Sequence, residues 1–447
     1  MNKKGFIHGA FILTVFGLVG KFIGAIYRVP LTRIIGVEGL GLYQMVFPLY
    51  SLLLTVSSSA FPNAISKMLS EAYASNKIND AKNIFKVSVK ILLILSSLCF
   101  LFVIVFAKLI AKLQGNIGVE VCYYAIAPAI IIVSIIASLR GYFQAKENMK
   151  PSAVSGLIEQ CVKLIFGLLF ATLFVKQGVI WGAFGALLGV CISELFALVY
   201  LLICYAKEPK TKAYVKLNQK NVAKNIFKVT LPITFGSIIL PLSQFIDSAL
   251  IVNLLVMSGF NVVVATEMFG IQTGIVGAII NMPVVFSLSI ASAILPMISR
   301  QNVLNKKELT HTINKSIYIT LGLGLLAGIA VFICAKPIIF LLYGGSLKGD
   351  NITLASNLLR LASISIVYLS MTQTTTGILQ GLGKYKTPVI ALLIGGVIKL
   401  VLNIVLVKIS NINIFGAEIA TILCYGVAAV INLFSINNIK GNDAVIK

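Results

Sequence analysis

Long apolar runs recur along the whole chain, and three of the clearest are Ile91–Ala107, Ile317–Ala335 and Val389–Val407. A helix needs about 20 apolar residues to cross the hydrocarbon core of a bilayer. Inside lipid, every backbone N–H and C=O needs a partner within the protein, so only helices and closed barrels span the membrane. Barrel strands would give alternating segments of about ten residues, whereas these runs are continuous. The chain is therefore predicted to be an all-α polytopic membrane protein.

The composition agrees with this fold class, because hydrophobic residues form 58% of the chain and charged residues only 11%. Soluble domains contain about 25% charged residues. Lys3 and Lys4 precede the first apolar run, but no small-residue cleavage pattern follows it, so we expect that run to remain as an anchor. We expect about twelve spans, at residues 6–27, 40–64, 87–107, 121–143, 153–175, 179–205, 229–256, 267–297, 317–342, 357–380, 388–408 and 413–437.

The formal net charge of +23 is concentrated in alternate connections between these spans. The 206–228 connection carries Lys207, Lys210, Lys212, Lys216, Lys220 and Lys224. Because cytoplasmic loops of membrane proteins are enriched in Lys and Arg, we expect both termini and this connection to be cytoplasmic, in a multi-pass plasma-membrane protein. The lipid bilayer then accounts for the basic charge, and no nucleic-acid partner is expected.

Residues for catalysis or metal binding are scarce. The two histidines, His8 and His311, lie far apart, and the seven cysteines show no paired spacing. No nucleotide-binding loop of the Walker type is present. We therefore expect neither an enzyme nor a self-contained ATP-driven pump, and no metal or organic cofactor.

An internal repeat divides the chain into two halves. At an offset of 236, three residues recur: Gly141, Gln144 and Lys150 correspond to Gly377, Gln380 and Lys386. Six spans per half is an even number, so both halves have the same orientation, as in the parallel repeats of some secondary transporters. We predict an N-terminal lobe at 1–205, a basic cytoplasmic linker at 206–228 and a C-terminal lobe at 229–447. The substrate of such transporters binds between the repeats near the membrane midplane.

One N-terminal motif is more specific than the repeat. It reads Ile26-Tyr-Arg28-Val-Pro30-Leu-Thr-Arg33-Ile-Ile-Gly36-Val-Glu38-Gly39-Leu-Gly41-Leu-Tyr43-Gln44-Met-Val-Phe-Pro48. With the Gly-x-x-Gln-(x)₅-Lys-x-Pro element after the fourth span, it resembles the stage V sporulation protein B branch of polysaccharide transporters. This branch belongs to the multidrug/oligosaccharidyl-lipid/polysaccharide exporter superfamily, together with toxin extruders and lipid II flippases. The resemblance implies a MATE-like fold, and it implies transfer of a polyprenyl-diphosphate-linked sugar to the outer leaflet for cell-wall or spore-cortex synthesis.

The chain also departs from that family pattern. Relatives usually have fourteen spans, and in lipid II flippases the extra pair forms a groove for the lipid tail. Here the sequence ends at Lys447, after the twelfth predicted span. The stretch that corresponds to their second span, Leu52–Ser57, lacks their arginine. Their pair of basic residues in the first span is matched approximately by Lys21 and Arg28.

Ionisable residues inside spans are costly and mark functional positions. Lys163 and Lys399 are equivalent in the repeat and suit a diphosphate, or else they bind backbone carbonyls. Glu159 lies four residues before Lys163, so the two either neutralise each other or face the cargo. Lys21, between Gly20 and Gly24, indicates either close helix packing or a cavity. The full set of cavity candidates is Lys21, Arg28, Lys163, Lys399, Gln44, Gln272 and Asn281.

The seventh span combines prolines with polar residues. Pro232 and Pro241 frame Ser243, Gln244 and Asp247, and proline weakens a helix by removing a backbone hydrogen bond. By the resemblance to toxin extruders, Asp247 is the best candidate for a coupling H⁺ or Na⁺, with Gln244, Ser243 and Glu159 as further candidates. The alternative is that Asp247 only stabilises a kink.

Three functions remain open. The first is a flippase for a lipid-linked glycan, driven by the membrane potential or by a coupled ion. The second is a proton- or sodium-coupled antiporter for drugs or other cations on the same fold. The third is a membrane scaffold that transports nothing and binds wall-synthesis enzymes, which are also possible partners of a flippase. The N-terminal motif favours the first.

Overall fold

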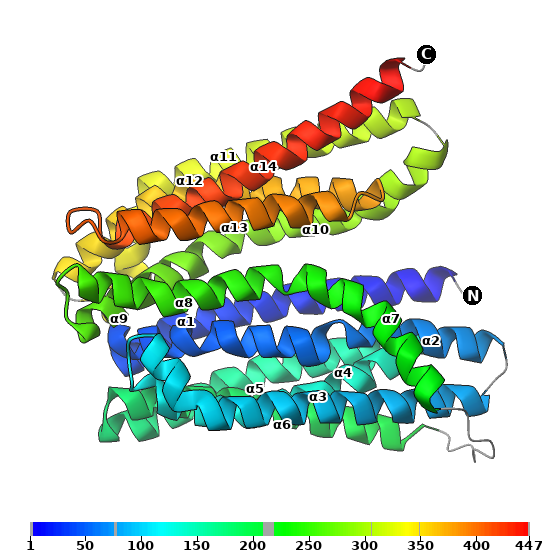
Figure 1. The fold of residues 1–447 in the computed structure, drawn as a ribbon, viewed down its shortest axis with the longest axis horizontal. Coiled ribbons are helices and arrows are strands. Elements are labelled where there is room, and N and C mark those ends of the chain that lie inside the picture. The colour runs from blue at the N-terminus through cyan, green and yellow to red at the C-terminus, as the bar shows by residue number, and fades with distance from the viewer. Residues whose placement is uncertain (1–2, 76–77, 209–218, 305, 348, 446–447) are drawn as a thin grey trace. The chain divides into compact units, whose positions relative to one another are not determined.

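The computed structural model describes the chain except for residues 1–2, 76–77, 209–218, 305, 348 and 446–447, and the described residues form helices and contain no strand (Figure 1). They form two compact units, Met1–Ile246 and Asp247–Lys447. Unit 1 contains α1 Lys3–Leu54, the π-helix η1 Thr55–Ser59, α2 Phe61–Ala74, α3 Ile78–Leu113, α4 Val119–Ala145, α5 Lys150–Phe174, the 3-10 turn η2 Val175–Gln177, α6 Val179–Ala206, α7 Gln219–Ser237 and the start of α8 Ile239–Met257. Unit 2 contains the rest of α8, α9 Val262–Gly270, the π-helix η3 Ile271–Val276, α10 Gly277–Leu304, α11 Lys306–Tyr343, α12 Asp350–Gly381, α13 Lys386–Leu406 and α14 Ile414–Val445.

Eleven stretches of the described residues are long and apolar enough to cross a membrane. The first, Val15–Ala74, has 60 residues, and a straight helix of that length would be about 90 Å long, three times the hydrocarbon thickness of about 30 Å. It is not straight, because α1 reverses at Gly36, where φ is 72° and ψ is −177°. That conformation is essentially restricted to glycine. The first stretch therefore crosses twice, and the twelve predicted crossings are confirmed.

The two units share one packing scheme, which is the structural form of the sequence repeat. In unit 1, α4 packs on α2, α3 and α6, and α5 packs on α6. In unit 2, α12 packs on α10, α11 and α14, and α13 packs on α14. The recurring glycines have the same task in both units. A Cβ on Gly141 would meet the Pro62 carbonyl at 2.9 Å, and one on Gly377 would meet the Ala291 carbonyl at 2.9 Å.

The boundary between the compact units lies at 246/247, later than the 206–228 linker that the sequence predicts between the lobes. The cause is α7, which packs on α2 and α3 of unit 1. Val222 and Ile226 of α7 are buried in the same hydrophobic cluster as Phe61 and Ile84. Part of the predicted linker, at 209–218, lies outside the described residues.

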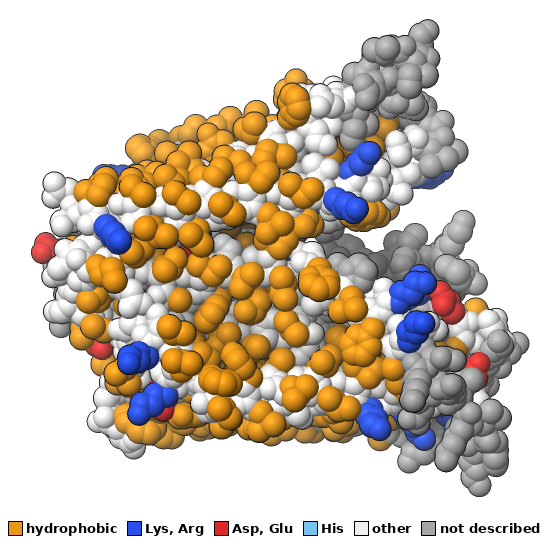
Figure 2. All heavy atoms as spheres, in the orientation of Figure 1, with side chains coloured by type: hydrophobic (Ala, Val, Ile, Leu, Met, Phe, Trp, Pro, Cys, Tyr) orange, Lys and Arg blue, Asp and Glu red, His pale blue; other side chains and the backbone are white. Residues whose placement is uncertain are grey.

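Apolar side chains also cover the outside of the helices. Leu341 is 78% exposed and Phe235 is 70% exposed. On a water-soluble protein, such side chains would form apolar patches that promote aggregation. Figure 2 shows hydrophobic side chains along the length of the helices and Lys and Arg side chains toward the helix ends. This distribution fits a protein whose lateral surface faces lipid.

Candidate functional site

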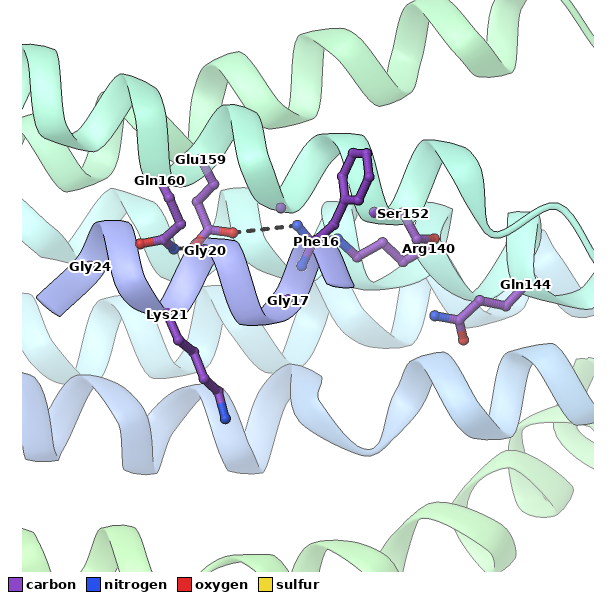
Figure 3. A pocket seen from close by; sticks show the side chains of 12 residues that line it. Phe16, Gly17, Gly20, Lys21, Gly24, Arg140, Gln144, Ser152, Glu159 and Gln160 are labelled. Carbon is purple, nitrogen blue, oxygen red and sulfur yellow. Dashed lines mark hydrogen bonds and ion pairs between the residues drawn. The ribbon is translucent and has the colours of Figure 1, made fainter. Parts of the chain in front are cut away.

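Unit 1 contains a cavity of about 420 Å³ between α1, α4 and α5 (Figure 3). Its polar lining residues come from these three helices. They are Lys21 of α1, Arg140 and Gln144 of α4, and Ser152, Glu159 and Gln160 of α5. The other lining residues are Phe16 and three glycines of α1, with Ala153 and Gly156 of α5. Apart from Phe16, the wall therefore consists mainly of backbone and polar side chains.

Glu159 is the centre of a hydrogen-bonded group on one side of this cavity. Its Oε2 lies 3.4 Å from the Arg140 guanidinium, and its Oε1 accepts a hydrogen bond of 2.9 Å from Gln160. Arg140 also donates through Nε to Ser155 at 3.1 Å. Arg140 extends from α4 and binds two side chains of α5, so its orientation is fixed.

Lys163 lies one helical turn further along α5 and binds a different partner. Its ammonium donates to Gln160 Oε1 at 2.5 Å and lies 6.0 Å from the centre of the Tyr27 ring. The direct pair between Glu159 and Lys163 that the spacing allowed is not formed, because Gln160 bridges the two. Glu194 of α6 is buried and interacts electrostatically with Glu159, Arg140 and Lys163.

Lys21 lies at the edge of the cavity, and both interpretations of its surroundings hold in part. A Cβ on Gly20 would lie 3.3 Å from Gln160 Cγ, and one on Gly24 would lie 3.2 Å from Gln160 Oε1. The two glycines thus allow α1 to approach α5 closely. In Figure 3 the Lys21 side chain points away from Glu159 and Arg140. It is exposed, and it has no ion-pair partner among the described residues.

Unit 2 contains a second polar group, and it joins two of the predicted residues. Lys399 of α13 donates to Asp247 Oδ2 at 2.5 Å, and Asn403 donates to Asp247 Oδ1 at 2.9 Å. The side chains of Lys399 and Asp247 are only 14% and 12% exposed. Asp247 therefore acts as the counter-ion of Lys399, in addition to any role at the break between α7 and α8.

Gln272 and Glu418 form a neighbouring buried pair in unit 2. Gln272 lies in the π-helix η3, and its Nε2 is 3.4 Å from Glu418 Oε2. The Gln272 Oε1 and Asn403 Oδ1 atoms are buried and have no hydrogen-bond donor among the described residues. π-helical segments inside α-helices are frequent at functional sites.

The remaining candidates lie apart from these groups. Asn281 is exposed and donates to the Gly277 carbonyl of its own helix at 2.7 Å. Gln244 is exposed and Ser243 is half-buried on α8. Gln44 is buried in α1, and Arg28 is half-buried, with its carbonyl accepting from Thr32.

Sequence reasoning missed Arg140, Gln160 and Asn403 as site residues. Arg140 lies within the predicted span 121–143 but near its cytoplasmic end, where topology alone accounts for a basic residue; in the structure it lies within α4. Its place directly before Gly141, which recurs in the repeat, was the available signal. Gln160 and Asn403 are uncharged, and nothing in their spacing distinguishes them.

Solved structures show which class of protein has this fold. The structure resembles an inward-facing multidrug resistance MATE family transporter of the MOP superfamily, with a TM-score of 0.73 and 15% identity over 94% of this chain and 95% of that one. It also resembles the lipid II flippase MurJ in an inward closed conformation, with a TM-score of 0.76 and 14% identity over 96% of this chain and 87% of that one. At these identities the likeness shows the fold, which this chain shares with a MATE family transporter and with a lipid II flippase.

Sequence comparisons define the family more closely. The polysaccharide biosynthesis protein family matches residues 6–302, and the MatE family matches residues 232–405. Stage V sporulation protein B of Bacillus subtilis (strain 168) is 29% identical over 94% of this chain and 82% of its own length. The lipid II flippase MurJ of the same organism is 27% identical over 95% and 81%, and its uncharacterized membrane protein YabM is 30% identical over 96% and 79%. The chain belongs to the polysaccharide biosynthesis protein family, which confirms the predicted family, and stage V sporulation protein B is among its similar relatives.

Proposed function

We propose that this protein moves a polyprenyl-diphosphate-linked oligosaccharide or peptidoglycan precursor from the cytoplasmic to the outer leaflet by alternating access. The observation that carries the proposal is the cavity of α1, α4 and α5. Its volume of about 420 Å³ lies within the usual range for small-molecule sites, about 300–1,000 Å³. Two of its relatives, a lipid II flippase and a stage V sporulation protein, support a cargo of this kind.

The chemistry of the cavity lining fits both polar parts of such a cargo. Lys21 and Arg140 offer cationic donors, and charge-assisted hydrogen bonds from such groups to phosphate are the strong ones. Gln144 and Ser152 offer neutral donors and acceptors that suit sugar hydroxyl and amide groups. Since Glu159 already neutralises Arg140, Lys21 is the cationic group of the lining that is available to bind a diphosphate.

The membrane potential is the driving force that we propose. A cell interior is electrically negative, so moving one net negative charge outward gains ~2.3 kcal/mol per 100 mV. In unit 2 the pair of Asp247 and Lys399 supports this mechanism, because a carboxylate already bound to an ammonium is not available to an exchanged cation. Coupling to H⁺ or Na⁺ is then not required at Asp247.

The experiment is leaflet exchange of a fluorescent lipid-linked precursor in proteoliposomes, with an imposed potential and no ion gradient. We expect Lys21→Ala to slow exchange by about tenfold or more, the equivalent of 1.4 kcal/mol, and Lys21→Arg to retain most of it. Lys408→Ala is the matched control, because Lys408 is an exposed lysine outside the cavity. Exchange that needs an ion gradient, or that is unchanged in Lys21→Ala, would contradict the proposal.

One observation favours a second candidate, an antiporter for drugs or other cations. The MatE family matches residues 232–405, which include Asp247 and Lys399. A cationic cargo must leave against the potential, so this function requires an exchanged ion. Export of a cationic dye driven by a proton or sodium gradient, with no exchange of the lipid-linked precursor, would support the antiporter instead.

A further inference from the structure

Unit 1 has a second cavity, of about 660 Å³, where three connections meet. We call it the Trp181 groove, and its polar and aromatic lining residues are Glu38, Glu120, Gln177 and Trp181. Glu38 follows the reversal of α1 at Gly36, Glu120 starts α4, and Trp181 starts α6. The groove thus lies at the opposite end of α4 from the connection to α5. The predicted topology places this end on the outer side of the membrane.

The connections that form the groove are held in place by buried contacts. The Gln114 side chain is fully buried, donates to the Met45 carbonyl at 2.9 Å and accepts from Tyr123 at 2.8 Å. A Cβ on Gly118 would lie 2.8 Å from Ile180, so the α3–α4 connection approaches the start of α6 as closely as glycine allows. The groove is therefore largely preformed, which lowers the cost of binding a ligand.

The lining chemistry excludes some ligands and fits others. No Lys or Arg is among the described residues that line the groove, so a phosphate or diphosphate finds no counter-ion there. Trp181 is 40% exposed, and its ring packs edge-to-face against Phe184 at 5.4 Å. The face of an indole ring carries partial negative charge and attracts the C–H groups on one face of a pyranose ring.

The carboxylates supply the matching polar contacts. Tyr124 donates to Glu120 Oε1 at 3.0 Å and so orients this side chain. It is the one side-chain partner of Glu120 among the described residues, which leaves acceptor capacity on the carboxylate for a ligand hydroxyl. Gln177, which is exposed on the same rim, has an amide that can donate and accept.

We propose that the Trp181 groove is a sugar-binding subsite, which takes a pyranose of the exported glycan on the side where the cargo is released. The proposal rests on the proposed function and adds where the sugar binds after transfer. An aromatic face with carboxylate and amide groups binds a neutral, hydroxyl-rich ring and leaves the diphosphate outside. The groove is open, and binding in the millimolar range, about 4 kcal/mol at 1 mM, suits a site that must release its ligand.

The test uses Trp181 as the reporter, because it is the only tryptophan of the 447 residues. The full chain in nanodiscs is titrated with N,N′-diacetylchitobiose while the intrinsic fluorescence is recorded. We expect a saturable change with a Kd of the order of 1 mM and a Kd at least about tenfold higher for Glu120→Gln. Glu71→Gln, an exposed acid on α2, is the matched control and should bind like the wild type. Sodium diphosphate and calcium chloride should cause no saturable change.

Three outcomes would overturn the sugar subsite: no saturable change with the disaccharide, the same change with diphosphate or calcium alone, or equal binding by Glu120→Gln. A second arm carries the same disaccharide on a polyprenyl diphosphate in the nanodisc. A fluorescence change is expected there too, and a change with the free disaccharide but none with its lipid-linked form would also overturn the proposal. The soluble titration involves no transport. Its failure therefore leaves the proposed function untouched, whereas absent leaflet exchange with intact sugar binding would contradict the proposed function alone.

Discussion

At the scale of single residues, the contact between Asp247 and Lys399 changes the roles that the sequence suggests for these two side chains. The repeat makes Lys399 the equivalent of Lys163, and the sequence alone suggests a common task. The structure gives Lys399 a carboxylate partner at 2.5 Å and gives Lys163 an amide partner at the same distance. The repeat has therefore preserved the position of the lysine but not its electrostatic surroundings.

We predict that removing one charge of the Asp247–Lys399 pair destabilises the protein more than removing both. Removing one partner of a buried ion pair costs about 3–5 kcal/mol, because it leaves an uncompensated charge. Asp247→Asn alone should therefore lower the free energy of unfolding in detergent by about that amount. Asp247→Asn combined with Lys399→Met should recover most of the loss, because both charges are gone and residue 247 keeps an acceptor for Asn403.

Thermal or denaturant unfolding of the two single variants and the double variant checks this prediction as a double-mutant cycle. Lys408→Met, at an exposed position, serves as the control and should be close to the wild type. A double variant that is as unstable as the sum of the single variants would show that the two side chains act independently.

At the scale of helices, glycine determines how closely the elements of each unit approach. A Cβ on Gly189 of α6 would lie 2.3 Å from the Gly167 Cα of α5, and one on Gly395 of α13 would lie 2.5 Å from the Cys424 carbonyl of α14. Both obstacles are backbone atoms, so no side-chain rotation relieves the clash. The helix pair must instead separate.

We predict that Gly189→Ala and Gly395→Ala each lower the free energy of unfolding by about 1–3 kcal/mol or more, the cost of overpacking. Gly322→Ala in α11 is the matched control, because a Cβ there meets nothing within 4 Å. That variant should be neutral or more stable by up to about 1 kcal/mol, since alanine favours a helix over glycine. Equal unfolding midpoints for the three variants would contradict the close contacts.

At the scale of the whole molecule, the orientation in the membrane is a prediction from the distribution of Lys and Arg. On a background without the seven native cysteines, we expect Asn261→Cys to react with a membrane-impermeant thiol reagent in intact cells. Lys212→Cys, in the part of the chain that the structure does not describe, should react only after the cells are opened. The reverse pattern would invert the topology and place the Trp181 groove on the cytoplasmic side.

The sequence was sufficient for the helices and the repeat, because the length of an apolar run and its recurrence are properties of the chain itself. It was sufficient for candidate charges too, since an ionisable residue in a span is conspicuous. The sequence did not predict the partners of those charges, because the rotation and packing of the helices determine them. Arg140 of α4 joins Glu159 of the next helix, α5, and Asn403 joins Asp247 from a helix distant in sequence. The Trp181 groove needs three connections that are scattered along the chain.

The reversal of α1 at Gly36 has a consequence for how the protein is made. The two spans are joined by a single non-helical residue, so no hydrophilic loop separates them while the chain is synthesised and inserted. In the predicted topology, the tip of this hairpin has to pass through the membrane together with both of its arms. Arg33 and Glu38 lie on either side of Gly36, so the tip carries one base and one acid and no net charge. Insertion of this first hairpin is then neither helped nor hindered by the membrane potential, unlike that of a basic loop.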